Sequence, residues 1–209
     1  MGPLEAFDAI VAAGAAPAHA ERVAEMKRAF EKRTGSFGPE DPWFEVRSRA
    51  FWDDAVARQG FARVVLPEVA LGARHWVAPL AGAHRGLFEA ERRSEGWILR
   101  DLWGGADFAV EHAEVGMRDA LSAAESPLDA RIVARVTPSR LEVAILPGAI
   151  FHREDARDAI LKVVDAARAR GLTTDEALDA LLRMERNLQS LSRVKPGYAY
   201  RESALNAPR

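Results

Sequence analysis

The 209-residue chain has a hydrophobic fraction of 48%, which is enough for a core of ordinary size. Its 31 acidic and 29 basic residues are interspersed and give a formal charge of −2, without the basic excess that nucleic-acid binding usually needs. The lack of cysteine excludes disulfides, thiolate catalysis and cysteine zinc sites, and since no stretch reaches the roughly 18 apolar residues of a membrane span, we expect a cytoplasmic protein.

Residues 1–59 show helical periodicity. Apolar stripes over 4–13 and 23–30 predict two helices, and Asp41, which is followed by proline, is expected to cap a third. After them the pattern breaks into short apolar runs separated by proline and glycine. Residues 60–83 are therefore expected to form a linker or a packed loop.

In residues 84–151 the periodicity changes from about 3.6 to 2, which predicts a β-module. The first three strands are expected to form a meander through a Ser-Glu-Gly turn and a Gly-Gly hairpin, and the last two to pair across a Pro-Ser turn. The expected strands are 87–92, 97–103, 106–112, 132–136 and 141–145.

Residues 152–195 predict a helical hairpin. Gly171 can end its first helix, and Thr173 and Glu176 have the spacing of a capping box that starts the second. The second helix carries an apolar seam, which is expected to pack on the same chain or, as an alternative, in a dimer. The residues of the seam are Leu181, Met184, Leu188 and Leu191. Residues 196–209 are expected to form a loose tail.

These patterns predict an α+β fold with N-terminal helices, a five-stranded antiparallel sheet or small partly closed barrel, and a C-terminal helical hairpin. Closing the sheet would protect its edge strands from pairing with other chains. We expect the segments to form one compact unit.

No pattern indicates a catalytic or metal centre. Glu111 and His112 are neighbours in an expected strand, so their side chains leave opposite faces and cannot readily bind one ion. Asp53 and Asp54 are adjacent on an expected helix, and ordinary solvation or a partner arginine such as Arg58 at i+4 explains Asp54. We therefore expect no catalytic residue, no metal and no cofactor.

Five tryptophans are the most unusual part of the composition, because large aromatic side chains can stack on bases or anchor a partner protein. Core packing is the competing explanation for most of them. Arg100 lies in an apolar strand, which indicates a structural ion pair, a solvent edge or a ligand contact. The candidate ligand or partner surface consists of Trp76, Trp97, Arg100, Trp103 and His112.

The motifs GLFEAER at 86–92, GWILRDLWGG at 96–105, FAVEH at 108–112 and ARIVARV at 130–136 resemble the β-module of bacterial proteins that often carry a SEC-C segment. The resemblance covers residues 84–151. It implies a small curved sheet or barrel and assigns no catalytic residue. The SEC-C segment is a cysteine-containing zinc-binding tail, so its metal function is not implied for a chain without cysteine.

The leading prediction is a non-enzymatic binding or regulatory protein that holds a protein partner or a second copy at an apolar or aromatic surface beside the β-module. One alternative is nucleic-acid binding through exposed aromatic side chains of this module, although the 8 basic and 11 acidic residues of 84–151 argue against it. The other alternative is an enzyme with a pocket between sheet and helices that uses His84, His112, Glu111 or Arg100.

Overall fold

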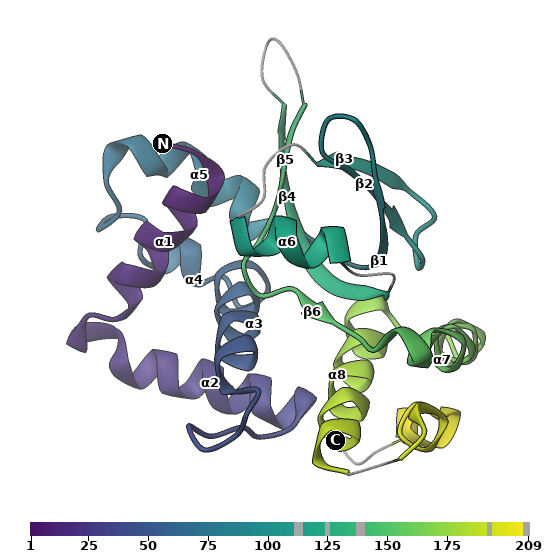
Figure 1. Cartoon of the computed structure of the whole chain (residues 1–209). Coiled ribbons are helices and arrows are strands. Elements are labelled where there is room, and N and C mark those ends of the chain that lie inside the picture. Colours follow the sequence, from purple (N-terminus) through teal and green to yellow (C-terminus); the bar gives the residue numbers. More distant parts are fainter. Residues whose placement is uncertain (111–114, 124–125, 137–140, 192–193, 207–209) are drawn as a thin grey trace.

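The computed structural model describes the chain except for residues 111–114, 124–125, 137–140, 192–193 and 207–209 (Figure 1). It has the predicted α+β architecture, with a curled antiparallel sheet between helices from the N-terminal and C-terminal thirds of the chain. Among the helices described, none combines the length and the apolar character that crossing a membrane requires.

Five helices precede the sheet. They are α1 (Pro3–Gly14), α2 (Ala20–Thr34), α3 (Phe44–Ala57), α4 (Phe61–Val64) and α5 (Leu71–Ala81). The expectation of a linker or packed loop over 60–83 is wrong, because α5 buries Trp76 and Leu80 in the N-terminal core. Gly72 falls in the first turn of α5, and Pro79 lies within its last turn, where it removes one helical hydrogen bond.

The cap predicted for α3 is also wrong. Asp41 accepts a hydrogen bond from the Gly38 N–H at 2.8 Å, which closes a turn before the helix, and α3 begins later, at Phe44. The side chain that was expected to satisfy the helix terminus thus stabilises the preceding loop.

The sheet contains the five predicted strands and a short sixth. They are β1 (His84–Arg92), β2 (Trp97–Asp101), β3 (Asp107–Val110), β4 (Leu128–Val136), β5 (Leu141–Ile145) and β6 (Ile150–Phe151). The strand order is β3-β2-β1-β4-β5 with every pair antiparallel, and β6 extends the sheet by pairing with β4. The predicted meander and the predicted pairing of β4 with β5, in which Ala134 is opposite Val143, are confirmed.

The sheet curls until β3 and β5, its two outer strands, approach each other. Alternation along the strands places one set of apolar residues, including Phe88, Leu99 and Ile132, on the same face. Leu121 of α6 (Val115–Ala123) packs against this set. The curled sheet is therefore filled by side chains of its own chain.

The C-terminal hairpin consists of α7 (Arg157–Ala169) and α8 (Thr174–Ser190). The predicted capping box is confirmed, since the Glu176 N–H donates to Thr173 Oγ1 at 3.3 Å and the Thr173 N–H donates to Glu176 Oε2 at 3.0 Å. Of the seam, Leu181, Met184 and Leu188 are buried within the chain, whereas Leu191 is 48% exposed. The buried part of the seam thus packs on its own chain.

The chain after α8 is not a loose tail in the part that is described. It forms two short 3-10 turns, Pro196–Tyr198 and Glu202–Asn206, and Tyr200 between them is buried. The expectation is wrong because a tyrosine hydroxyl can be buried once it finds polar partners, and Tyr200 finds them in His152 and Glu185.

Gly148, in the connection between β5 and β6, lies against α3. A Cβ atom at this position would be 2.7 Å from Ala50 Cα and 2.7 Å from the Arg49 carbonyl oxygen, both of which are backbone atoms. The contact fixes the distance between α3 and the edge of the sheet, because neither backbone can move aside cheaply.

We expect Gly148→Ala to lower the free energy of unfolding by about 1–3 kcal/mol, the usual cost of overpacking. Gly72→Ala is the matched control, since its added Cβ meets no atom within 4 Å and alanine favours a helix. Urea unfolding of both variants measures the difference. Equal stability of the two variants would contradict the close approach at Gly148.

Candidate functional site

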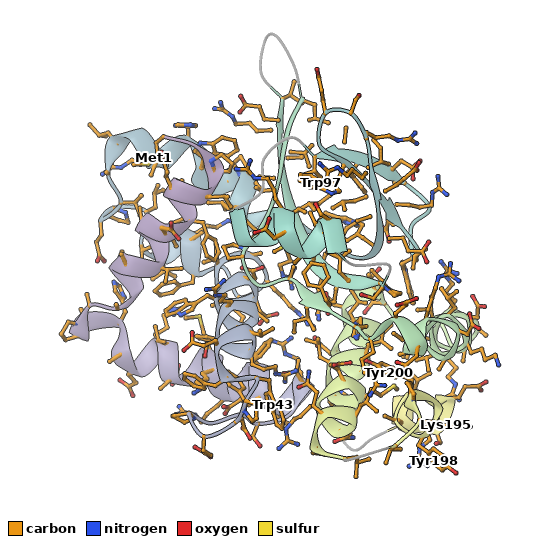
Figure 2. The ribbon with its side chains drawn as sticks, in the orientation of Figure 1. Met1, Trp43, Trp97, Lys195, Tyr198 and Tyr200 are labelled. Atoms are coloured by element: carbon orange, nitrogen blue, oxygen red, sulfur yellow. The ribbon has the colours of Figure 1, made fainter. Side chains whose placement is uncertain are left out.

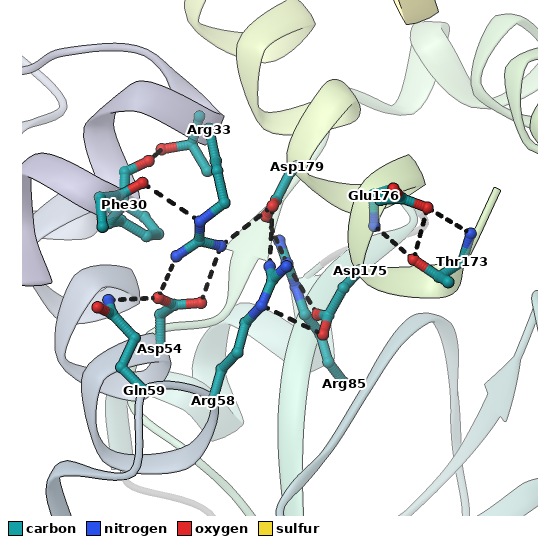
Figure 3. A network of polar contacts seen from close by, with 12 residues as sticks. Phe30, Arg33, Asp54, Arg58, Gln59, Arg85, Thr173, Asp175, Glu176 and Asp179 are labelled. Atoms are coloured by element: carbon teal, nitrogen blue, oxygen red, sulfur yellow. Dashed lines mark hydrogen bonds and ion pairs between the residues drawn. The ribbon is translucent and has the colours of Figure 1, made fainter. Parts of the chain in front are cut away.

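Alternation in the central strands places arginine and aspartate on the face of the sheet that is turned toward α3 and α8. Arg85 in β1 is directly opposite Arg131 in β4, with Asp129 two residues away on the same face. Two buried guanidinium groups side by side need carboxylate partners. The helices supply most of them, and the resulting arginine–aspartate network consists of Arg33, Asp54, Arg58, Arg85, Asp129, Arg131, Asp175 and Asp179. Figure 3 labels the members of this network other than Asp129 and Arg131.

Arg85 is at the centre of this network. Its Nε and Nη2 donate to the two oxygens of Asp129 at 3.0 and 2.8 Å, and its Nη1 donates to Asp179 at 2.7 Å. Burial opposes the charge of Arg85, but Asp129 and Asp179 outweigh burial and hold the pKa of the guanidinium well above its ordinary value. Arg85 thus stays charged and joins β1, β4 and α8.

Asp179 joins the sheet to the N-terminal helices. Besides Arg85, it accepts hydrogen bonds from Arg33 at 3.1 Å and from Arg58 at 2.9 Å. Burial favours the neutral acid, but the three arginines, Arg85 first, outweigh it and lower the pKa of Asp179. With four arginines against four aspartates, the network has balanced formal charge, which favours a structural role.

The sequence-based partner of Asp54 is wrong. Asp54 binds Arg33 at 2.6 Å and is 3.4 Å from Arg131, while Arg58 turns to Asp179 of α8. The backbone of Arg58 keeps the i+4 geometry, since its N–H donates to the Asp54 carbonyl oxygen at 2.9 Å, but the Arg58 side chain binds Asp175 and Asp179 of α8 instead of the Asp54 carboxylate.

Asp53 lies behind the network, against the connection between β5 and β6. Its Oδ2 accepts a hydrogen bond from the Gly148 N–H at 3.0 Å, and the residue is 3% exposed. Burial raises the pKa of Asp53 well above its ordinary value, although Arg131 and the Gly148 N–H oppose the shift. Asp53 therefore differs from the aspartates of the network, which have arginine partners within 4 Å.

A second buried polar cluster fixes the chain after α8. His152 Nδ1 is 2.8 Å from the Tyr200 hydroxyl and 3.4 Å from Glu185, and Tyr200 itself donates a short hydrogen bond to Glu185. Burial, assisted by Glu185, raises the pKa of Tyr200, so the hydroxyl keeps its proton. Because all three side chains are buried, the cluster is suited to anchoring the C-terminal segment rather than to reacting with a substrate.

An open groove lies between the start of α3, β6 and the end of α8. Its volume is about 480 Å³, within the range of about 300–1,000 Å³ that ligand sites occupy. It is lined by Pro42, Trp43, Val46, Ala149, Ile150, Phe151 and Gln189, and we call it the β6 groove. The lining is mostly apolar. Its one amide side chain, Gln189, donates to buried Glu185 at 2.9 Å.

The predicted tryptophan surface does not exist in the structure. Trp76 is 2% exposed and packs among the N-terminal helices, while Trp97 is 8% exposed and packs inside the sheet. Trp103 is half-buried against the C-terminal hairpin, with Arg168 over its ring. The three side chains belong to three different cores, and Figure 2 shows Trp97 within the sheet and far from Trp43 of the β6 groove.

The predicted polar site residues also separate. Arg100 is exposed and pairs with exposed Asp107 at 3.2 Å, so it marks a solvent edge. His84 lies on the other face of the sheet, where its Nε2 is 3.0 Å from buried Asp101. His112, like Glu111, lies outside the described residues, so this part of the prediction is untested.

Comparisons of the chain with protein-family models, with curated proteins and with solved structures gave no match. The resemblance of residues 84–151 to the β-module of SEC-C-associated proteins stays a prediction. Sequence reasoning missed Trp43, Val46 and Phe151 as site residues. Their only signal was aromatic or apolar character, and the positions that meet in the groove are about a hundred residues apart in the chain.

We expect Arg85→Met to lower the free energy of unfolding by about 3–5 kcal/mol, because the substitution leaves Asp129 and Asp179 buried without their main partner. Arg100→Met, which removes an exposed partner of Asp107, is the matched control and should change stability little. Denaturant unfolding at neutral pH compares the two. A small loss for Arg85→Met would show that the network is not a structural centre.

The pH dependence of stability tests the raised pKa of Asp53. The folded protein holds this proton to higher pH than the unfolded chain, so the stability contribution of Asp53 is full below the ordinary pKa of 3.8 and is lost as pH rises toward the raised value. Asp53→Asn is neutral throughout and avoids the loss. We expect the free energy of unfolding of Asp53→Asn relative to the unsubstituted protein to increase with pH. A difference that is constant from acid to neutral pH would contradict the shift.

Proposed function

We propose that this is a non-enzymatic binding protein of the cytoplasm that docks an apolar segment of a protein partner in the β6 groove. The observation that carries the proposal is a groove of about 480 Å³ with a mostly apolar lining, placed beside the β-module. Protein interfaces depend on a few apolar anchors that fill such pockets and exclude water.

The lining of the groove suits an apolar side chain from an extended partner segment. Val46 on one wall is 45% exposed, so it presents apolar surface that a partner would cover. Phe151, which also lines the groove, belongs to β6, and β6 pairs with a strand on one side only among the strands described. An edge strand offers backbone hydrogen-bonding groups to an added segment, so the groove can combine apolar anchoring with strand pairing.

The placement of the aromatic and polar residues favours partner binding over the two alternatives, nucleic-acid binding and catalysis. Stacking of bases needs exposed aromatic rings, and Trp97 is buried inside the β-module. Acid–base catalysis needs converging groups, and Arg100 and His84 lie on opposite faces of the sheet.

The test is a selection of random peptides from a display library against the full-length protein, followed by affinity measurements on Val46→Glu and Leu71→Glu. Glutamate at position 46 places a charge in the groove, so selected peptides should bind this variant at least about tenfold more weakly, or about 1.4 kcal/mol. Leu71 is 79% exposed at the start of α5 and lines no part of the groove, so Leu71→Glu is the control.

Peptides that bind Val46→Glu as tightly as the control, or a selection that yields none, would overturn the proposal. Sedimentation velocity over a wide range of protein concentration identifies a second copy as the partner. Self-association that Val46→Glu abolishes and Leu71→Glu retains would place another molecule of this chain in the groove.

A further inference from the structure

A small cavity, distinct from the β6 groove, lies where α3 and the β5–β6 connection meet β1 and β4, and its lining combines charged and apolar residues. Its volume is about 20 Å³. Its charged lining consists of Asp53, Asp54, Arg85, Asp129 and Arg131. We propose that this cavity is a binding site for a single water molecule, which links the Asp53 carboxyl group to the arginine–aspartate network.

The volume of the cavity limits which molecule it can hold. A buried water needs a volume of at least about 10–15 Å³ on this measure, so a cavity of about 20 Å³ holds one water and no larger molecule. The backbone contacts of Gly148 with Ala50 and Arg49 hold one wall in place, so the cavity does not close by a small shift of α3.

The buried Asp53 side chain favours a polar molecule in the cavity. Its Oδ2 accepts from Gly148, but no described residue makes a hydrogen bond to its Oδ1, although the side chain is buried. A buried polar atom without a partner costs about 1–3 kcal/mol. A water in the adjoining cavity removes this cost.

The charges around the cavity do not call for a cation. The formal charges of Arg85 and Arg131 balance those of Asp54 and Asp129, so with a neutral Asp53 the lining has no net negative charge to attract a sodium or potassium ion. Water both donates and accepts, so it can accept from a guanidinium and donate to Asp129 while it bonds to Asp53. Burial raises the pKa of Asp53 well above its ordinary value and so favours the neutral carboxyl, in which Oδ1 can carry a proton to donate to that water.

The proposal is independent of the function of the β6 groove. The occupied cavity would extend the network from Arg131 to Asp53 and, through the Gly148 N–H, to the connection between β5 and β6. One water molecule would thereby complete the polar contacts at the closest approach of α3 to the sheet.

The test begins with the unsubstituted protein. A high-resolution crystal structure should show density for one ordered atom within hydrogen-bond distance of Asp53 Oδ1. In solution, the Gly148 amide proton should give a cross-relaxation signal to a long-lived bound water. Absence of both signals would overturn the proposal, and so would anomalous density at the site after crystals are soaked in rubidium, which would identify a monovalent cation.

Two variants locate the water at Asp53. Asp53→Asn keeps two polar atoms and should retain the water signal at Gly148, whereas Asp53→Val has a side chain of similar size without polar atoms and should lose it. Retention of the signal in Asp53→Val would place the water elsewhere and overturn the assignment. If Asp53→Val does not fold, the crystal structure and the solution signal of the unsubstituted protein decide.

Discussion

Arg85 brings a positive charge into the interior on a central strand, and the energetics of that charge constrain the elements around it. Desolvation of a guanidinium costs several kcal/mol unless carboxylates surround it in good geometry. Asp129 satisfies part of the requirement from β4, but the third hydrogen-bonding nitrogen, Nη1, donates to Asp179 and Asp175 of α8. The sheet therefore reaches a low free energy only when α8 lies across it. Arg33 and Arg58 share Asp179, which extends the same requirement to α2 and to the end of α3.

The position of the β6 groove follows from this junction. α3 contributes Asp54 to the network and Val46 to the groove, eight residues apart, or about 12 Å along a helix. α8 contributes Asp179 to the network and Gln189 to the groove, ten residues apart, or about 15 Å. The two helices that the network holds against the sheet thus also form walls of the groove a few turns away. A partner in the groove would contact elements that the network keeps in place, which lowers the ordering cost of binding.

The aromatic residues show that composition alone can suggest a function that the structure does not favour. Five tryptophans in 209 residues are compatible with a stacking surface for bases. In the structure Trp76 and Trp97 fill separate cores, and Trp43 lies at the groove. Aromatic side chains are large enough to dominate core packing. Their number therefore says little about function until their exposure is known.

Local physical chemistry made much of the fold predictable from the sequence. The register of β4 with β5 pairs residues that are close in the chain, from Val136 with Leu141 to Ile132 with Ile145, and the capping box joins Thr173 to Glu176. Both patterns can therefore be recognised within one short segment. The polar contacts are different, because Arg85 meets Asp179 across 94 positions and Arg33 meets Asp179 across 146. Helix α5 and the anchored C-terminal segment were missed for the same reason, since the partners that bury them come from distant parts of the chain. The sequence by itself determined the elements and the pairing of neighbouring strands, and the tertiary structure decided which charges pair and where the groove forms.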